Sequence, residues 1–150
     1  MIIFKEGVKK EDIAKLTVPI QAMLFYCHHL HREMGIDMRV TSLIRDRAGL
    51  KQVSRSHQDG RAFDLGIITL NNMQKHKIAE DMHNVFDRVC IGAFPKGVMN
   101  PKKTDMGTIL VDKTHGNGTH FHFQVRPNGF IIEEYMEFCN YLLKLHRIEV

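Results

Sequence analysis

The side chains best suited to chemistry lie in two short segments. Residues 54–64 read Ser-Arg-Ser-His-Gln-Asp-Gly-Arg-Ala-Phe-Asp, and residues 120–122 read His-Phe-His. Imidazole nitrogen and carboxylate oxygen are ligands that suit zinc at a catalytic site, where three protein ligands leave one position for water. We therefore interpret His57, Asp64 and His122 as candidate zinc ligands.

The segment around Asp64 alternates small or acidic side chains with large apolar ones. Residues two apart on a strand share a face, so Asp64 would lie between Ala62 and Gly66, whose side chains are the smallest in the segment. The large alternate residues would face the core. Small neighbours leave room for a metal ion and allow a neighbouring strand to approach closely.

The His-Phe-His segment has the same alternation. His120, His122 and Gln124 would point one way, and the apolar residues between them would point into the core. A histidine pair two apart is also typical of a solvated strand face, and a His and an Asp seven apart mean little alone. If the two strands are adjacent, His122 converges with His57 and Asp64.

The rest of the pattern predicts the elements that must position these residues. Apolar residues at helical spacing, with Pro19 suited to a first turn and Gly35 to a stop, predict a first helix. Alternating and turn-rich segments predict the strands and loops. The expected helices are residues 19–35, residues 71 or 72 to about 90, and residues 133–146. The expected strands are residues 36–44, 107–113 and 119–126. Residues 91–107 are expected to form a loop, and residues 115–118 are expected to form a hairpin connection. This order predicts an α+β fold, with helices packed on a small antiparallel sheet.

The bulk composition fits one domain, residues 1–150, with 43% hydrophobic and 25% charged residues. No apolar run is long enough for a membrane span, and the first residues lack the features of a signal peptide, so we expect synthesis in the cytoplasm without a secretion signal. The three cysteines are far apart, which favours buried free thiols over disulfides.

The charge indicates little about partners. A net charge of +4 is compatible with attraction to anionic surfaces and equally with a mildly basic surface that has no partner. There is no long basic run and no interleaving of aromatic with basic residues, so we expect no nucleic-acid partner. His28 and His29 are expected to be solvated because both lie off the apolar stripe of their helix, and His76, His83 and His146 are expected at the surface or at helix ends.

The motif His57-x-x-Gly60-x-Ala62-x-Asp64, followed by a strand with His122, resembles the zinc signature of the D-Ala-D-Ala metallopeptidase family. That family includes D,D-carboxypeptidases, vancomycin-resistance dipeptidases and phage L-alanyl-D-glutamate endolysins. It is related to the penicillin-insensitive murein endopeptidases and to the hedgehog signalling domain. The segment 41–46, Thr-Ser-Leu-Ile-Arg-Asp, resembles the family's strand that ends in an arginine, so the resemblance gives Arg45 the role of holding substrate near the zinc.

The chain departs from the family pattern at Thr119. Many members have a carboxylate there, three residues before the last histidine, as general base. The murein endopeptidase branch instead has His-x-His, which His120 and His122 resemble, and its Ser-His-Gln start matches 56–58. The resemblance therefore makes His120 the stand-in for the missing carboxylate, with His115 in the preceding loop as an alternative.

The resemblance implies a zinc peptidase that hydrolyses an L-Ala-D-Glu or D,D-type amide bond in peptidoglycan stem or cross-link peptides. Such a domain without a signal peptide fits a phage enzyme acting at the bacterial cell wall. The main alternative is an inactive zinc-stabilised domain of the same fold, used for binding or as a virion component, which Thr119 favours. A different His-x-His metal enzyme, such as a hydratase or oxygenase, fits less well with the context of Gly60 and Ala62.

Overall fold

A computed structural model describes residues 1–45, 55–86, 111–113, 120–125, 127 and 131–150. Its elements follow in chain order. They are β1 (Ile2–Phe4), a 3-10 helix η1 (Lys10–Lys15), α1 (Val18–Glu33), β2 (Met38–Ser42), α2 (Arg55–Gln58), β3 (Ala62–Gly66), α3 (Asn72–Phe86), β4 (Val111–Lys113), β5 (His120–Gln124) and α4 (Glu133–His146).

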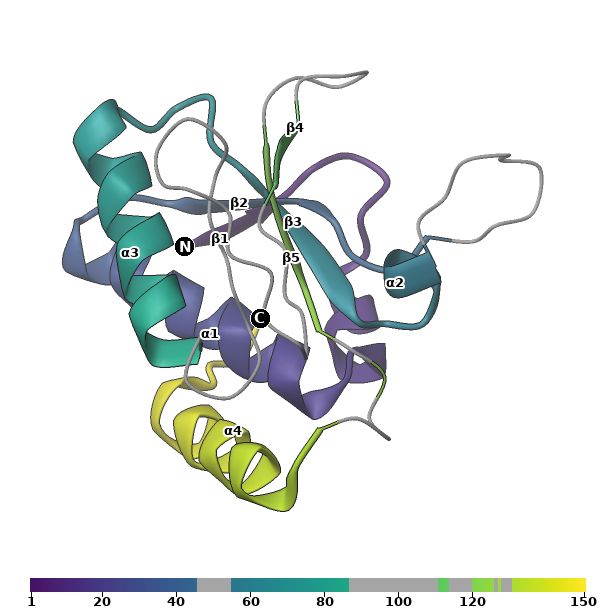
Figure 1. Ribbon diagram of the computed structural model, residues 1–150. Helices are drawn as coiled ribbons and strands as arrows, with labels where there is room; N and C mark the ends of the chain where they lie inside the picture. Colours follow the sequence, from purple (N-terminus) through teal and green to yellow (C-terminus); the bar gives the residue numbers. More distant parts are fainter. Residues whose placement is uncertain (46–54, 87–110, 114–119, 126, 128–130) are drawn as a thin grey trace.

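The strands form one five-stranded sheet in the order β1-β2-β3-β5-β4 (Figure 1). The pairs β2–β3, β3–β5 and β4–β5 are antiparallel, whereas β1 and β2 are parallel. Parallel strands need a long crossover connection, which α1 supplies here. The α+β class is thus confirmed. The sheet is mostly antiparallel, as predicted, but it is mixed because β1 is parallel to β2. This difference was not predicted, since the short strand β1 is not apparent in the sequence pattern.

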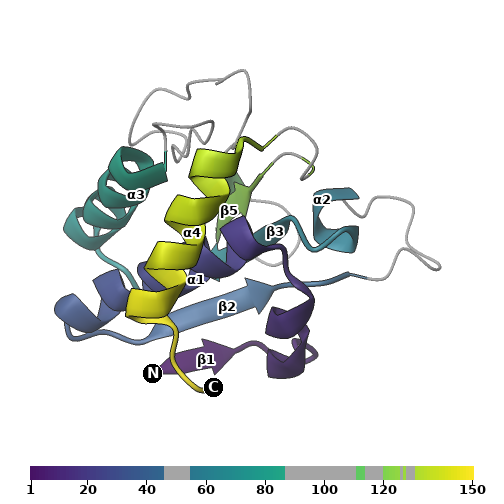
Figure 2. The same cartoon turned by 90° about the horizontal axis from the view of Figure 1, so that it is seen from below.

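Helices cover one face of the sheet in two layers. Figure 2 shows α4 lying across α1 on the side away from the sheet, and α3 packs beside α1. Because α1 is covered by the sheet and by α4, it is buried around most of its circumference. The prediction that His28 is solvated is therefore wrong, since its exposed fraction is 2%.

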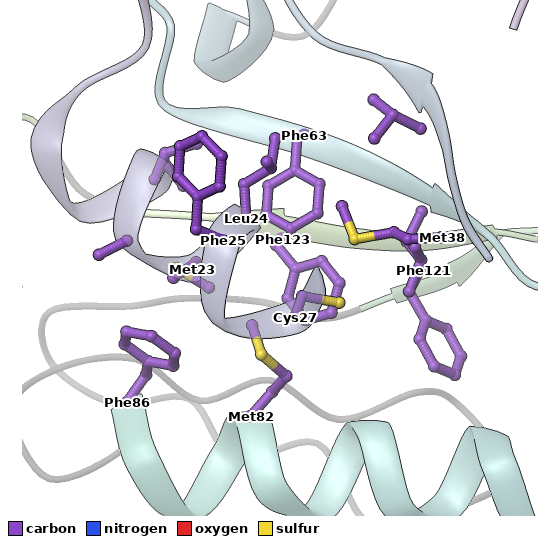
Figure 3. Packing of buried hydrophobic residues seen from close by; sticks show 14 of the residues in the cluster. Met23, Leu24, Phe25, Cys27, Met38, Phe63, Met82, Phe86, Phe121 and Phe123 are labelled. Carbon is purple, nitrogen blue, oxygen red and sulfur yellow. The ribbon is translucent and has the colours of Figure 1, made fainter. Parts of the chain in front are cut away.

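The hydrophobic core lies between the sheet and this helical layer (Figure 3). Phe63 and Phe123 are directly paired across β3 and β5, and their stacked rings have centroids 4.9 Å apart. Met23 and Cys27 of α1 and Phe86 of α3 belong to the same cluster. The apolar faces of β3 and β5 thus point toward the helices, which leaves the alternate residues of both strands for the opposite face.

Most predicted elements are confirmed, with small shifts in their ends. The last helix has the predicted bounds, and the first ends at Glu33, two residues before the expected Gly35. Residues 87–110 and 114–119 lie outside the described residues, so the end of the second helix, the loop 91–107 and the hairpin connection stay predictions. Cys27 and Cys139 are buried free thiols as expected, and Cys90 lies outside the described part. Among the described helices, none combines the length and apolar character that a membrane span requires.

Candidate metal centre

Asp64 occupies the middle of β3, a strand whose five residues are all buried. Its directly paired neighbours are Ser42 on β2 and His122 on β5. The strands that contain Asp64 and His122 are therefore adjacent, which is the condition on which the convergence of the candidate ligands depends. Paired residues share a face, so the carboxylate and the imidazole of His122 project together on the side of the sheet away from the helices.

His57 reaches the same place from α2, a one-turn helix that the sequence pattern does not reveal. The helix ends at Gln58 and is followed by a turn that contains Gly60, whose φ of +70° favours glycine. The amide of Arg61 donates to the carbonyl of Ser56 at 2.7 Å and closes this turn. A Cβ on Gly60 would lie 2.6 Å from the carbonyl oxygen of Lys15. Glycine at this motif position therefore permits both the turn and the close packing of α2 against η1.

Three potential ligand atoms converge at this point. Oδ1 of Asp64 lies 3.1 Å from Nε2 of His57 and 2.7 Å from Nδ1 of His122. All three residues are buried, and their potential ligand atoms lie within 4.8 Å of one another, which makes them a group that could hold a metal ion.

The outward ring nitrogens of both histidines already have partners. Nδ1 of His57 donates to the carbonyl of Leu43 at 2.8 Å, and Nε2 of His122 lies 2.8 Å from Oε1 of Gln124. The pairing of β2 with β3 shifts between Val40 and Ser42, a bulge just before the Leu43 carbonyl. A neutral imidazole has one proton, so these contacts leave both inner nitrogens with a lone pair directed at the carboxylate.

This arrangement fits a metal ion well. Two nitrogen lone pairs and one carboxylate oxygen are all acceptors, and acceptors this close need protons or a cation between them. Imidazole together with carboxylate suits zinc and also other first-row transition metals. The outer hydrogen bonds to Leu43 and Gln124 are the kind that orient histidine ligands in metal sites.

The electrostatics of Asp64 favour its anionic form. Burial acts to raise the pKa of the carboxyl. When protons rather than a cation lie between the three groups, the inner nitrogens of His122 and His57 donate hydrogen bonds to the carboxylate, and these bonds together with the positive charge of the rings outweigh burial. The pKa of Asp64 is therefore held well below its usual range, and the group is a carboxylate at neutral pH.

The second oxygen of Asp64 faces two other residues that the sequence singled out. Nη2 of Arg45 lies 3.7 Å from Oδ2, and Nε2 of His120 lies 3.6 Å from it. Nε of Arg45 donates to Oγ of Ser42 at 2.7 Å, which fixes the guanidinium above the strand. Arg45 and His120 thus border the candidate ligands, but His120 is not part of the group that could hold a metal ion.

Thr119 and His115 lie outside the described residues, so their positions stay open. Ser42 and the Leu43 carbonyl are participants that sequence reasoning missed. The partial match of 41–46 to an arginine-bearing strand was the available signal for Ser42, whereas no side-chain pattern can identify a carbonyl group.

Comparisons with known proteins add no relative. The sequence matches no protein-family model, and searches of curated proteins and of solved structures find no significant match. The assignment of this site therefore rests on its own geometry and on the motif.

Proposed function

We propose that this protein is a zinc-dependent peptidase that hydrolyses amide bonds in the stem or cross-link peptides of peptidoglycan. The observation that carries the proposal is the convergence of His57, Asp64 and His122, each outer histidine nitrogen being engaged elsewhere. The motif that places these residues resembles the D-Ala-D-Ala metallopeptidase and murein endopeptidase signatures. Both lines of reasoning select the same three side chains.

The chemistry follows from the donor set. Zinc, when bound, supplies Lewis acidity that polarises a carbonyl group and makes water a nucleophile near neutral pH. Three protein ligands are the number typical of catalytic zinc sites, since structural sites have four. Asp64 contributes the anionic charge, and its Oδ2 is left for neighbouring donors.

Arg45 and His120 take the two remaining roles. The planar guanidinium of Arg45 binds a substrate carboxylate or the developing oxyanion through paired N–H donors. Stem peptides of peptidoglycan have several free carboxylates, so an arginine beside the reacting carbonyl suits them. His120, with a side-chain exposure of 17%, accepts or passes a proton from the nucleophile to the leaving amine.

A second candidate is a zinc-stabilised domain without catalytic activity, which binds a partner or forms part of a virion. Thr119 favours it, because threonine cannot replace a general-base carboxylate. The candidates differ in one respect: only the enzyme turns over substrate once it is loaded with zinc.

The test is digestion of purified peptidoglycan sacculi by the zinc-loaded protein, with and without a chelator. Mass spectrometry of the released fragments identifies the new termini, and hence the bond. We expect release that stops with chelator and returns with added zinc. The variant Asp64→Asn, purified in the same way, controls for contaminating hydrolases. If the fully loaded protein releases nothing from several peptidoglycan chemotypes, the non-enzymatic domain becomes the better assignment.

A further inference from the structure

Gln124 lies beside the candidate metal centre. Within the described residues, it is hydrogen-bonded to His122 and not to the carboxylate of Asp64. It follows His122 by two positions on β5, so the two side chains share a face. Its directly paired neighbour on β3 is Ala62, which has only a methyl group as its side chain. Oε1 of Gln124 lies 2.8 Å from Nε2 of His122.

The position of one proton decides whether His122 can bind a metal. Its Nδ1 is the nitrogen that faces Oδ1 of Asp64, at 2.7 Å, so a metal shared with the carboxylate must use the Nδ1 lone pair. A neutral imidazole with a free Nδ1 has its proton on Nε2. Because His122 is only 4% exposed, that N–H depends on a protein acceptor.

We propose that Gln124 is a positioning residue that holds His122 in the tautomer whose Nδ1 is free to bind metal. This inference rests on the metal centre of the proposed function and names a residue that acts on it through His122. Oε1 accepts the Nε2 proton and fixes the plane of the ring. Glutamine does so without adding a second negative charge beside Asp64.

For His57, the acceptor of the outer ring N–H is the backbone carbonyl of Leu43, which a substitution cannot remove. Gln124 is therefore the point at which the outer hydrogen bonds of the centre can be tested. Loss of such a partner typically weakens metal binding about 10- to 100-fold.

The experiment measures zinc affinity by competition with a chromophoric chelator at fixed pH, for wild type, Gln124→Met and Gln124→Glu. Methionine resembles glutamine in shape but lacks a strong acceptor, so we expect affinity to fall about 10- to 100-fold. Glutamate keeps the acceptor oxygen, so we expect affinity equal to or higher than that of wild type. Gln21→Leu is the matched control, because it removes a partly buried glutamine that is hydrogen-bonded to the Leu16 carbonyl and to Arg147 and to none of the candidate ligands in the described hydrogen bonds. This variant should leave zinc affinity unchanged.

Nitrogen NMR of the histidine rings reports which ring nitrogen is protonated, and a change in packing alone would not alter this result. In zinc-loaded wild type, His122 should show a protonated Nε2 and a metal-bound Nδ1, and Gln124→Glu should preserve this signature. Equal zinc affinity of wild type and Gln124→Met would overturn the inference and leave the metal centre intact. Equal loss in Gln124→Met and Gln124→Glu would also overturn it, since the acceptor would then be irrelevant. A wild type that binds no zinc would refute the metal centre itself.

Discussion

Asp64 and His122 are directly paired across β3 and β5, and Oδ1 of the carboxylate lies 2.7 Å from Nδ1 of the ring. The other oxygen of the same carboxylate faces Arg45 and His120. One buried side chain thus separates two sets of partners, the candidate metal ligands on one side and the candidate substrate-handling residues on the other. Substitutions on the two sides should therefore have different consequences.

On the ligand side, we expect one zinc ion per chain in wild type and loss of stoichiometric zinc in Asp64→Ala and Asp64→Asn. The asparagine keeps the shape of the residue and removes the anionic charge that a divalent cation requires. Elemental analysis after dialysis measures the metal content. Asp81→Asn, which removes a carboxylate paired with Lys77 on α3, should keep its zinc. Full retention of zinc by Asp64→Ala would contradict the assignment.

On the other side, Arg45→Ala should lose peptidase activity while zinc remains bound. Removal of one donor that stabilises developing negative charge costs about 10²- to 10³-fold in rate. Arg45→Lys should restore only part of the activity, because an ammonium group cannot form the paired hydrogen bonds of a guanidinium. The measurement is the rate of release of new amino termini from sacculi. Unchanged kinetics in Arg45→Ala would show that this is merely a surface arginine beside an acid.

His120→Ala should likewise keep zinc and lose activity, by about two to four orders of magnitude if the imidazole is the general base. His115→Ala tests the alternative base in the preceding loop. Rates for both variants are measured at neutral pH, with metal content determined on the same samples. An inactive His115→Ala together with an active His120→Ala would retain the reaction class and reassign the base.

The sequence predicted those features that depend on side-chain alternation. The shared face of Asp64 with Ala62, and of His122 with Gln124, follows from period-two spacing, and the adjacency of the two strands was the one assumption needed. Features that depend on tertiary contacts were missed. The three-residue strand β1 is too short for a pattern, and the one-turn helix α2 is defined by the turn at Gly60. His28 is buried on a helix that contacts both the sheet and other helices, and a helical pattern does not show how many sides of a helix are covered.

Gly60→Ala should destabilise the fold more than Gly35→Ala does. Both glycines have positive φ, +70° and +69°, so alanine carries a conformational cost of about 1–2 kcal/mol at either position. At Gly35 a Cβ would meet nothing within 4 Å, whereas at Gly60 it would lie 2.6 Å from a backbone oxygen of η1. Such overpacking adds about 1–3 kcal/mol. Denaturant unfolding of the two variants measures the difference, and equal losses would show that the contact with η1 is unimportant.

Stability should fall as pH decreases from about 6.5 to about 4, in part through His28. Burial, which has the largest effect, and the positive charges of the N-terminal ammonium group and Arg32 together lower the pKa of this imidazole to about 4. Within the described residues, its Nε2 has no hydrogen-bond partner that would favour the charged ring. In the unfolded chain the pKa returns to its ordinary value near 6.5, so between these two values the unfolded state binds a proton that the folded state does not. The free energy of unfolding then decreases with falling pH, by at most about 1.4 kcal/mol per pH unit for one group.

Substitution of His28 by leucine tests this assignment, because an apolar side chain fills part of the same space and binds no proton. We expect His28→Leu to lose less stability than wild type between pH 6.5 and 4.5, measured by urea unfolding at several pH values. His76→Leu, on the exposed side of α3, is the control and should follow the wild-type curve. Release of metal on acidification would lower the stability of all three proteins alike, so the difference between wild type and His28→Leu isolates the contribution of His28. Parallel curves for these two proteins would show that His28 is charged in the folded state, or that its proton does not influence folding.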